Sequence, residues 1–114
     1  MKLENILEKK NKFLDENIFY GLKNLNDGFD AEGIKYFSET DFEEVLKRIK
    51  KLGLGIMGIE PWENGEFYNV SVYEDFTHDS TDSNWYIKVF ESYKEEKENL
   101  QYGATYYIPE RLLQ

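Results

Sequence analysis

The segment SETDFEEVLKRIKKLG (residues 38–53) has the clearest pattern of apolar and polar positions in the chain. Its apolar residues recur at intervals of three and four, which is typical of one face of an α-helix. Ser38 is a suitable N-cap, because its hydroxyl can accept a hydrogen bond from the first free amides, and Gly53 can adopt the left-handed conformation that often ends a helix. The pattern therefore predicts a helix whose apolar face consists of Phe42, Val45, Leu46, Ile49 and Leu52.

The chain before this helix gives weaker signals. Residues 3–14 place apolar side chains at helical spacing and predict a short amphipathic helix. Residues 17–25 permit at best a second, weaker helix, because Gly21 and the turn-forming sequence NLNDG interrupt the pattern. The sequence GIKYF, residues 33–37, predicts a short strand that leads into the main helix.

After Gly53 the apolar period changes to two, which is typical of β-strands. The alternation predicts strands over residues 54–62, 67–74, 85–93 and 102–108. Gly55 and Gly58 interrupt the first strand, where we expect a bulge or a close backbone approach. Pro61 cannot donate to a central ladder, so that end of the strand is predicted at a sheet edge or already in the turn.

Asn64-Gly65 is the strongest hairpin signal in the sequence, because a type I′ turn needs two residues with positive φ. The strand that returns from this turn alternates cleanly, and one of its faces is expected in the core. The predicted core positions of this and the later strands include Tyr68, Val70, Val72, Trp85 and Tyr106.

Together these elements predict an α+β fold in a single domain over residues 1–114. In this fold, N-terminal helices pack on one face of an antiparallel β-meander of three to five strands. The other face of the sheet is expected to be partly exposed, as is common for antiparallel sheets.

The charge of the chain changes this picture from a generic domain to an acidic one. Its 114 residues carry a formal net charge of −9 and no cysteine. Residues 1–54 hold 11 acidic and 10 basic residues, whereas residues 55–114 hold 12 and 4. Such a field repels nucleic acid and anionic membranes and speeds encounter with cationic proteins. We therefore expect neither nucleic acid nor a membrane as a partner, and no base lies between Lys51 and Lys88.

The sequence also bears on location. The first residues lack the pattern of a signal peptide, and no apolar run approaches the roughly 20 residues that cross a bilayer. A cytoplasmic location is the resulting expectation.

The candidate catalytic and metal-binding chemistry lies in one polar loop. His78 is the only histidine and lies between Asp75 and Asp79, where it is a general base, a metal ligand or an exposed loop residue. The carboxylates of this loop and Asn84 are oxygen ligands for a hard cation, but the spacing of an EF-hand is absent. We therefore predict no catalytic residue, no metal and no cofactor. A small enzyme that uses His78 with Asp75 or Asp79 stays as an alternative.

Aromatic residues make up 17% of the chain, more than one small core needs. Aromatic anchors among charged residues are the makeup of a protein-binding surface. This composition favours an interaction protein over an enzyme. The predicted partner-binding residues are Glu60, Trp62, Glu63, Glu66, Phe67, Tyr73, Asp75, Asp79 and Asp82.

The segments GIEPWENGEFYNVSVYEDF (58–76) and NWYIKVFESY (84–93) resemble the hairpin-plus-strand region of immunity proteins from bacterial polymorphic-toxin and contact-dependent growth inhibition systems. The resemblance extends over residues 33–110 and includes no diagnostic motif, so no functional residue is carried over. It implies a protein that binds a cognate toxin domain, often a basic nuclease, and blocks its active site. An acidic surface would complement the cationic cleft of such a nuclease.

A homodimeric adaptor or interaction module is the second interpretation. In it, the outer aromatic residues pair two copies of the chain. The sequence leaves the oligomeric state open and favours a monomer.

Overall fold

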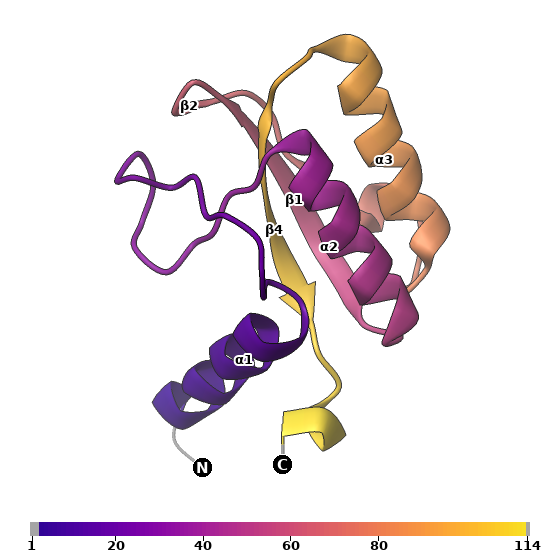
Figure 1. Ribbon diagram of the computed structural model, residues 1–114. Coiled ribbons are helices and arrows are strands. Elements are labelled where there is room, and N and C mark those ends of the chain that lie inside the picture. The colour runs from indigo at the N-terminus through magenta and orange to yellow at the C-terminus, as the bar shows by residue number, and fades with distance from the viewer. Residues whose placement is uncertain (1–2, 114) are drawn as a thin grey trace.

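An open antiparallel sheet of four strands is the centre of the computed structural model, which describes residues 3–113 (Figure 1). The central strand is β1 (Gly55–Glu63). On one side it pairs with β4 (Gln101–Tyr107), and on the other side with β2 (Glu66–Phe67) and then β3 (Ser71–Val72). The predicted α+β class with an antiparallel sheet is confirmed.

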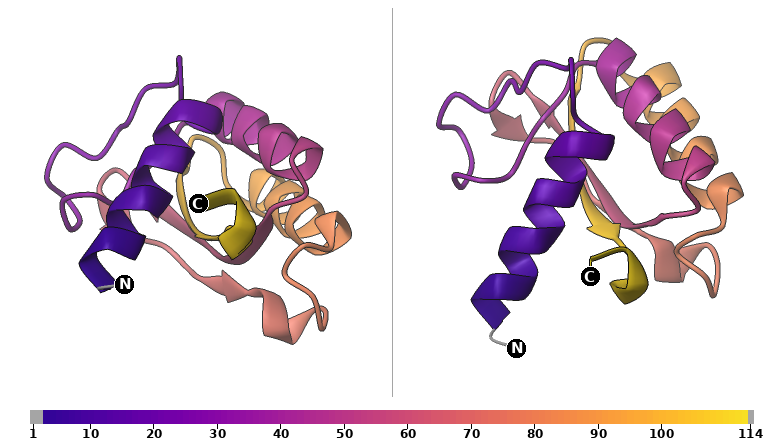
Figure 2. Two further views of the ribbon diagram at one scale, coloured as in Figure 1. Left: turned by 90° about the horizontal axis from the view of Figure 1, so that it is seen from below. Right: turned by 60° about the horizontal axis from the view of Figure 1, so that its bottom comes forward.

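The described part of the chain contains three α-helices in addition to this sheet. Of these, α2 (Glu39–Lys51) and α3 (Ser83–Glu96) lie side by side on the same face of β1 and β4 (Figure 1). The first helix, α1 (Leu3–Asn17), stands apart from them, close to the 3₁₀ turn η2 (Glu110–Leu113) near the C-terminus (Figure 2). None of the described helices has the length and apolarity that a membrane crossing requires.

The prediction for α2 (Glu39–Lys51) is confirmed at both of its ends. The Ser38 hydroxyl accepts a hydrogen bond from the Asp41 amide at 3.2 Å. At the other end Gly53 has a φ of 69°, and its amide and the next one donate back into the last turn at 3.1 and 3.0 Å. This pair of bonds defines a Schellman motif. Leu52 is 42% exposed, contrary to prediction, because it caps the helix after the last turn that faces the sheet.

The predicted strand over 85–93 is wrong, since these residues belong to the helix α3. Asp82 caps this helix by accepting a hydrogen bond from the Asn84 amide at 3.0 Å. Aromatic and β-branched residues favour strands, which explains the error. The buried side chains nevertheless recur at helical intervals, as Trp85, Tyr86, Val89, Phe90 and Tyr93. Trp85 and Tyr106 are buried as predicted.

The strand that returns from the hairpin is broken into β2 and β3, whereas a continuous strand over 67–74 was expected. At the break, the amides of Tyr68 and Asn69 both donate to the Pro61 carbonyl, at 3.0 and 3.3 Å. In an antiparallel sheet, the N–H and C=O groups of one residue point toward the same neighbouring strand. Pro61 points its C=O toward the returning strand but has no N–H to donate to it, so the ladder between the two strands is interrupted here. The expected edge or turn position of Pro61 is therefore wrong, because the residue is buried in the central strand.

The break also reverses the faces that were predicted for the returning strand. Val70 and Val72 are 47% and 38% exposed, so neither belongs to the core. Ser71 faces α3 in their place, and its hydroxyl lies 2.6 Å from the hydroxyl of Tyr93. Tyr68 is half-buried, with its ring 6.5 Å from that of Tyr93.

Two elements expected before α2 do not form as predicted. Residues 17–25 form no second helix, because the chain turns after α1 and Gly21 adopts a φ of 78°. Residues 33–37 add only one bridge to the sheet, through Phe37. The main chain of Tyr36 instead bonds to the loop that precedes it, at 2.7 and 3.0 Å.

Buried tyrosines should make the fold sensitive to alkaline pH. Among the described residues, the hydroxyls of Tyr86, Tyr102 and Tyr106 are buried without a hydrogen-bond partner. Burial raises the pKa of all three, and that of Tyr86 to about 12. Because these pKa values are raised in the folded state, the stabilisation by the neutral phenols is complete below about pH 10, the ordinary pKa of tyrosine. Above about pH 10 this stabilisation decreases by about 1.4 kcal/mol per pH unit for each tyrosine.

Chemical unfolding of Tyr86→Phe from neutral pH to about pH 12 tests this expectation. The variant should unfold with nearly unchanged free energy at neutral pH, because the lost hydroxyl has no partner. Above pH 10 its stability should fall less steeply than that of the wild type. Tyr107→Phe, at an exposed position, is the control and should keep the wild-type slope. Equal slopes for all three proteins would contradict the interpretation.

Candidate functional site

The face of the sheet opposite α2 and α3 is not covered by any helix of the described chain (Figure 1). We call it the outer face and define it by the side that carries Gly58, Glu60, Trp62, Val70, Val72, Gly103 and Thr105. A shallow groove of about 330 Å³ crosses it between β3 and β4. Glu60 and Glu74 lie on the lining of this groove.

A bulge in β1 adds a large apolar side chain to this groove. The register between β1 and β4 shifts between Ile56 and Gly58, as the glycine predicted. Ile56 stays fully buried, whereas Met57 is 41% exposed. Ile34 is also 41% exposed at the same groove. Together with Val70 and Val72 these residues form a cluster of apolar side chains open to solvent, which is typical of an interaction site.

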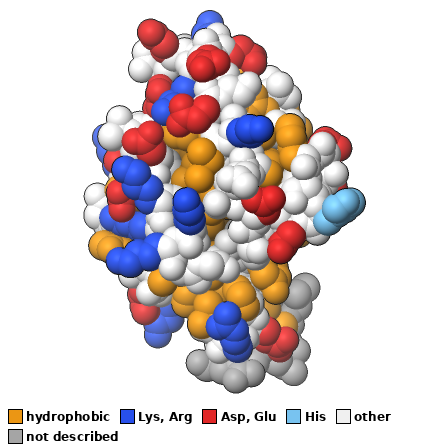
Figure 3. Space-filling view, turned by 90° about the vertical axis from the view of Figure 1, so that its right-hand side faces the viewer, with side chains coloured by type: hydrophobic (Ala, Val, Ile, Leu, Met, Phe, Trp, Pro, Cys, Tyr) orange, Lys and Arg blue, Asp and Glu red, His pale blue; other side chains and the backbone are white. Residues whose placement is uncertain are grey.

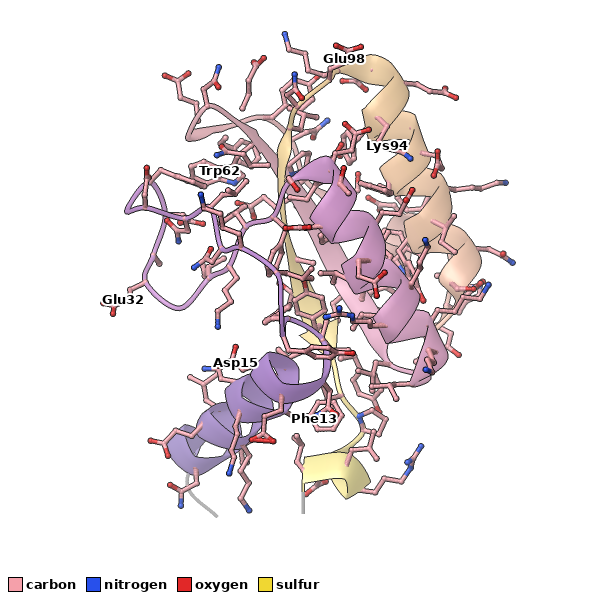
Figure 4. All side chains as sticks on the ribbon, in the orientation of Figure 1. Phe13, Asp15, Glu32, Trp62, Lys94 and Glu98 are labelled. Atoms are coloured by element: carbon pink, nitrogen blue, oxygen red, sulfur yellow. The ribbon has the colours of Figure 1, made fainter. Side chains whose placement is uncertain are left out.

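An aromatic cluster bounds one end of the outer face, and it depends on a glycine. The ring of Tyr36 lies on Gly103, where an added Cβ would be 2.6 Å from the ring. Phe29 and Trp62 complete the cluster, with ring centroids 5.0 to 5.5 Å apart. Trp62 lies between the hairpin and the loop that carries Glu32 (Figure 4).

Glu60 is held inside this cluster by two donors. Its carboxylate accepts hydrogen bonds from the Trp62 indole at 2.6 Å and from the Tyr36 hydroxyl at 3.2 Å. The same hydroxyl lies 2.6 Å from a carboxylate oxygen of Asp30. Burial, followed by the hydrogen bond to Asp30 and the charge of Glu60, raises the pKa of Tyr36. Two predicted binding residues, Glu60 and Trp62, thus have partners within the chain.

The hairpin turn keeps two of the predicted residues exposed and gives another a partner. Asn64 and Gly65 have φ values of 50° and 79°, the two positive angles that a type I′ turn requires. Glu66 and Phe67 follow the turn and are exposed. Glu63 lies 2.9 Å from the ammonium of Lys97, just after α3. The segment between Lys51 and Lys88, which contains no lysine or arginine, is therefore partly neutralised by a lysine from a distant part of the chain.

The other predicted residues lie at the opposite end of β1. The amide of Ile56 donates to Ser80 at 3.0 Å, which places the 75–84 loop beside the start of this strand. Glu63 is at its far end, roughly 25 Å away for a strand of this length. The predicted binding set is therefore split into two groups. The group near the loop consists of Tyr73, Asp75, Asp79 and Asp82.

Two carboxylates of this second group stabilise local structure. Asp82 caps α3, and Asp79 accepts hydrogen bonds from the amide and hydroxyl of Thr81 at 2.9 and 2.8 Å. These bonds lower the pKa of Asp79. His78 is exposed. Within residues 3–113, no three His, Cys, Asp or Glu side chains are grouped so that they could hold a metal ion.

Most of the outer-face groove was not among the predicted binding residues. Val70 and Val72 were assigned to the core, and Ile34, Met57 and Tyr36 were not singled out. The one sequence signal was Gly58, which marked the bulge that exposes Met57. Glu60 and Tyr73 are the two residues that belong both to the prediction and to the lining of this groove.

The side formed by α2 and α3 differs in its charges. There, acidic and basic side chains are interspersed (Figure 3). Lys94, between the two helices in Figure 4, lies 3.3 Å from Glu43 and 3.1 Å from Glu91. Arg48 lies 2.9 Å from Glu44 on α2. Part of the negative charge on this side is therefore compensated locally.

Comparisons of the chain with protein-family models, with curated proteins and with solved structures found no match.

Substitution of Gly103 tests the packing that supports the outer face. Gly103→Ala should lower the free energy of unfolding by about 1–3 kcal/mol, because the fully buried Tyr36 ring cannot move away from the new methyl group. Urea denaturation measures the change. Gly58→Ala is the matched control, since its Cβ would meet its nearest neighbour at 3.4 Å. Equal losses in the two variants would show that the contact with Tyr36 is unimportant.

Proposed function

We propose that this protein binds and neutralises a cognate toxin domain in the cytoplasm, as an immunity protein that covers the toxin's active site without performing chemistry. The observation that carries the proposal is the uncovered outer face, with four exposed apolar side chains in a groove lined in part by carboxylates. Apolar anchors provide the affinity of protein interfaces, and a charged rim provides their specificity and association rate.

Charge complementarity favours a cationic partner. The chain carries a net charge of −9, most of it in the second half. Near the outer face, Glu66 and Glu74 are exposed, and no basic side chain of the described residues pairs with either. A nuclease needs a cationic cleft because its substrate is a polyanion. A toxin of this class would be attracted to the carboxylates and would lose access to its substrate once bound.

The compensated charges of α2 and α3 support the choice of surface. Three acidic residues on that side, Glu43, Glu44 and Glu91, have a basic partner in Lys94 or Arg48. The apolar groove lies on the other side of the sheet. The outer face therefore combines the two properties that a docking surface for a basic protein needs.

Co-expression tests the proposed neutralisation. The first step is to sequence the gene immediately upstream, where the proposal expects a large secreted protein whose C-terminal domain is the probe. The wild-type chain should co-purify with this domain and restore the growth of cells that produce it. Val72→Asp should weaken the complex about thirtyfold or more, because a buried charge replaces an apolar anchor.

Leu52→Asp is the matched control for this experiment, since it places the same group at an exposed apolar position away from the outer face. This variant should protect cells as well as the wild type does. Failure of the wild type to bind or protect would refute toxin neutralisation. Equal activity of both aspartate variants would show that the outer face is not the docking surface.

Charge reversal tests the electrostatic part of the proposal. Glu74→Lys should slow association with the same toxin domain about threefold to tenfold at low salt, and the difference should shrink at high salt. Glu95→Lys changes the net charge equally but lies on α3, and should have a smaller effect. Stopped-flow measurement of the two association rates decides between them, and equal slowing would contradict steering through the outer face.

A further inference from the structure

The outer edge of β4 is open along most of its length. At one end, the main chain of Tyr102 exchanges two hydrogen bonds with Phe37, at 2.8 and 2.9 Å. Successive residues of a strand point their main-chain N–H and C=O groups toward the strands on opposite sides. The main-chain groups of Gly103 and Thr105 therefore point toward β1, whereas those of Ala104 and Tyr106 point toward the open edge. Among residues 3–113, the bridge at Phe37 is the one strand contact on this edge.

A groove of about 280 Å³ lies beside this edge, between α1 and the chain around Ile34. Its lining includes Ala104 and Tyr106 of β4 and apolar side chains such as Leu14. A second groove, of about 410 Å³, continues along the strand past Tyr106 toward Ile108. The two grooves share Lys10 and Tyr106, so they follow β4 without a break in their lining.

Lys10 is the charged side chain common to both grooves. It is half-buried, and none of the described carboxylates forms an ion pair with it. Burial lowers the pKa of Lys10, as expected for an ammonium group that lacks a counter-charge. A carboxylate placed in the groove would supply that counter-charge. The neighbouring Lys35 differs, because it is already paired with Asp15.

We propose that the free edge of β4 accepts an extended segment of another protein, which adds to the sheet as a further strand and places a carboxylate at Lys10. Unpaired main-chain groups on a sheet edge are a template for such pairing. The ion pair between Lys35 and Asp15 borders the path of this strand, and exposed pairs of this kind open at little cost. The proposal does not rest on toxin neutralisation, because it concerns the main-chain edge of β4 and needs no cationic partner, although its grooves share Ile34 and Met57 with the outer-face groove.

A second copy of the chain fits this edge less well. Two copies would each carry a net charge of −9, so their approach is opposed at long range. Each copy would also present α1 beside the edge that has to pair. A short segment with a single carboxylate meets much less of this repulsion than a second copy does, and it brings no helix of its own.

Hydrogen exchange on the intact protein is the first test. The probe is a display library of short random peptides, from which the enriched peptides are synthesised and added to the labelled protein. The amides of Ala104 and Tyr106 should exchange rapidly in the free protein and become protected on binding. Those of Gly103 and Thr105 should be protected in both states. This alternation is expected for strand addition and not for side-chain docking on a face of the sheet.

Variants of the protein provide the second test. Ala104→Pro removes an amide that faces the open edge, where proline is tolerated, and should weaken peptide binding about tenfold. Lys10→Gln should weaken the binding of acidic peptides about fivefold or more. Lys12→Gln is the control on the same helix and should leave the affinity unchanged. If Ala104→Pro unfolds, the exchange pattern of the wild type and the two lysine variants still decide the matter.

Three results would overturn the proposal: no peptide is enriched, the enriched peptides carry no carboxylate, or they protect amides without the alternation. Sedimentation of the wild type tests whether a second copy of the chain binds at this edge. A concentration-dependent dimer that Ala104→Pro abolishes would identify a second copy of the chain at this edge and would also refute the acidic segment.

Discussion

Every other strand of the sheet pairs with β1, so two irregularities in this strand decide what the sheet presents to solvent. The bulge at Met57 turns a long apolar side chain out of the core, while Ile56 and Ile59 stay inside. Pro61 has no amide to offer the returning strand, and that strand breaks into two. Val70 and Val72 emerge on the outer face as a result. The apolar groove is therefore a product of backbone pairing, and the composition of the strands alone would not create it.

Local signals made part of this fold predictable. Ser38 and Gly53 mark the ends of α2, and Asn64-Gly65 fixes the hairpin, because each acts through residues a few positions away. The segment that forms α3 was ambiguous, since its aromatic residues satisfy a period of two as well as helical spacing. Its capping residue, Asp82, was the signal that distinguished the two. The facing of Val70 and Val72 was not predictable, because it depends on an interruption caused by another strand.

The proposed binding surface was less predictable than the fold, because its contacts join distant segments. Glu60 and Trp62 come from the predicted acidic stretch, but their partner Tyr36 arrives from a loop whose path no periodic pattern gives. Lys97 neutralises Glu63 in the same way. Glu74 stays exposed at the apolar groove, so charge and apolar side chains lie together on the outer face and not in the polar loop. The sequence predicted an acidic and aromatic surface, whereas the exposed apolar side chains of the groove are aliphatic, and only the packing could place them together.

The pairing of β1 with β4 has a consequence for how the molecule assembles. Its contacts join residues separated by 39 positions at Trp62 and Gln101, and by 52 at Gly55 and Tyr107. The hairpin closes over a few residues, whereas this ladder has to close a loop that contains the whole of α3. Non-local pairing of this kind is slow relative to helix and hairpin formation. We therefore expect that one edge of β1 is unpaired during folding until β4 pairs with it. The negative charge of the second half of the chain opposes association of such partly folded chains.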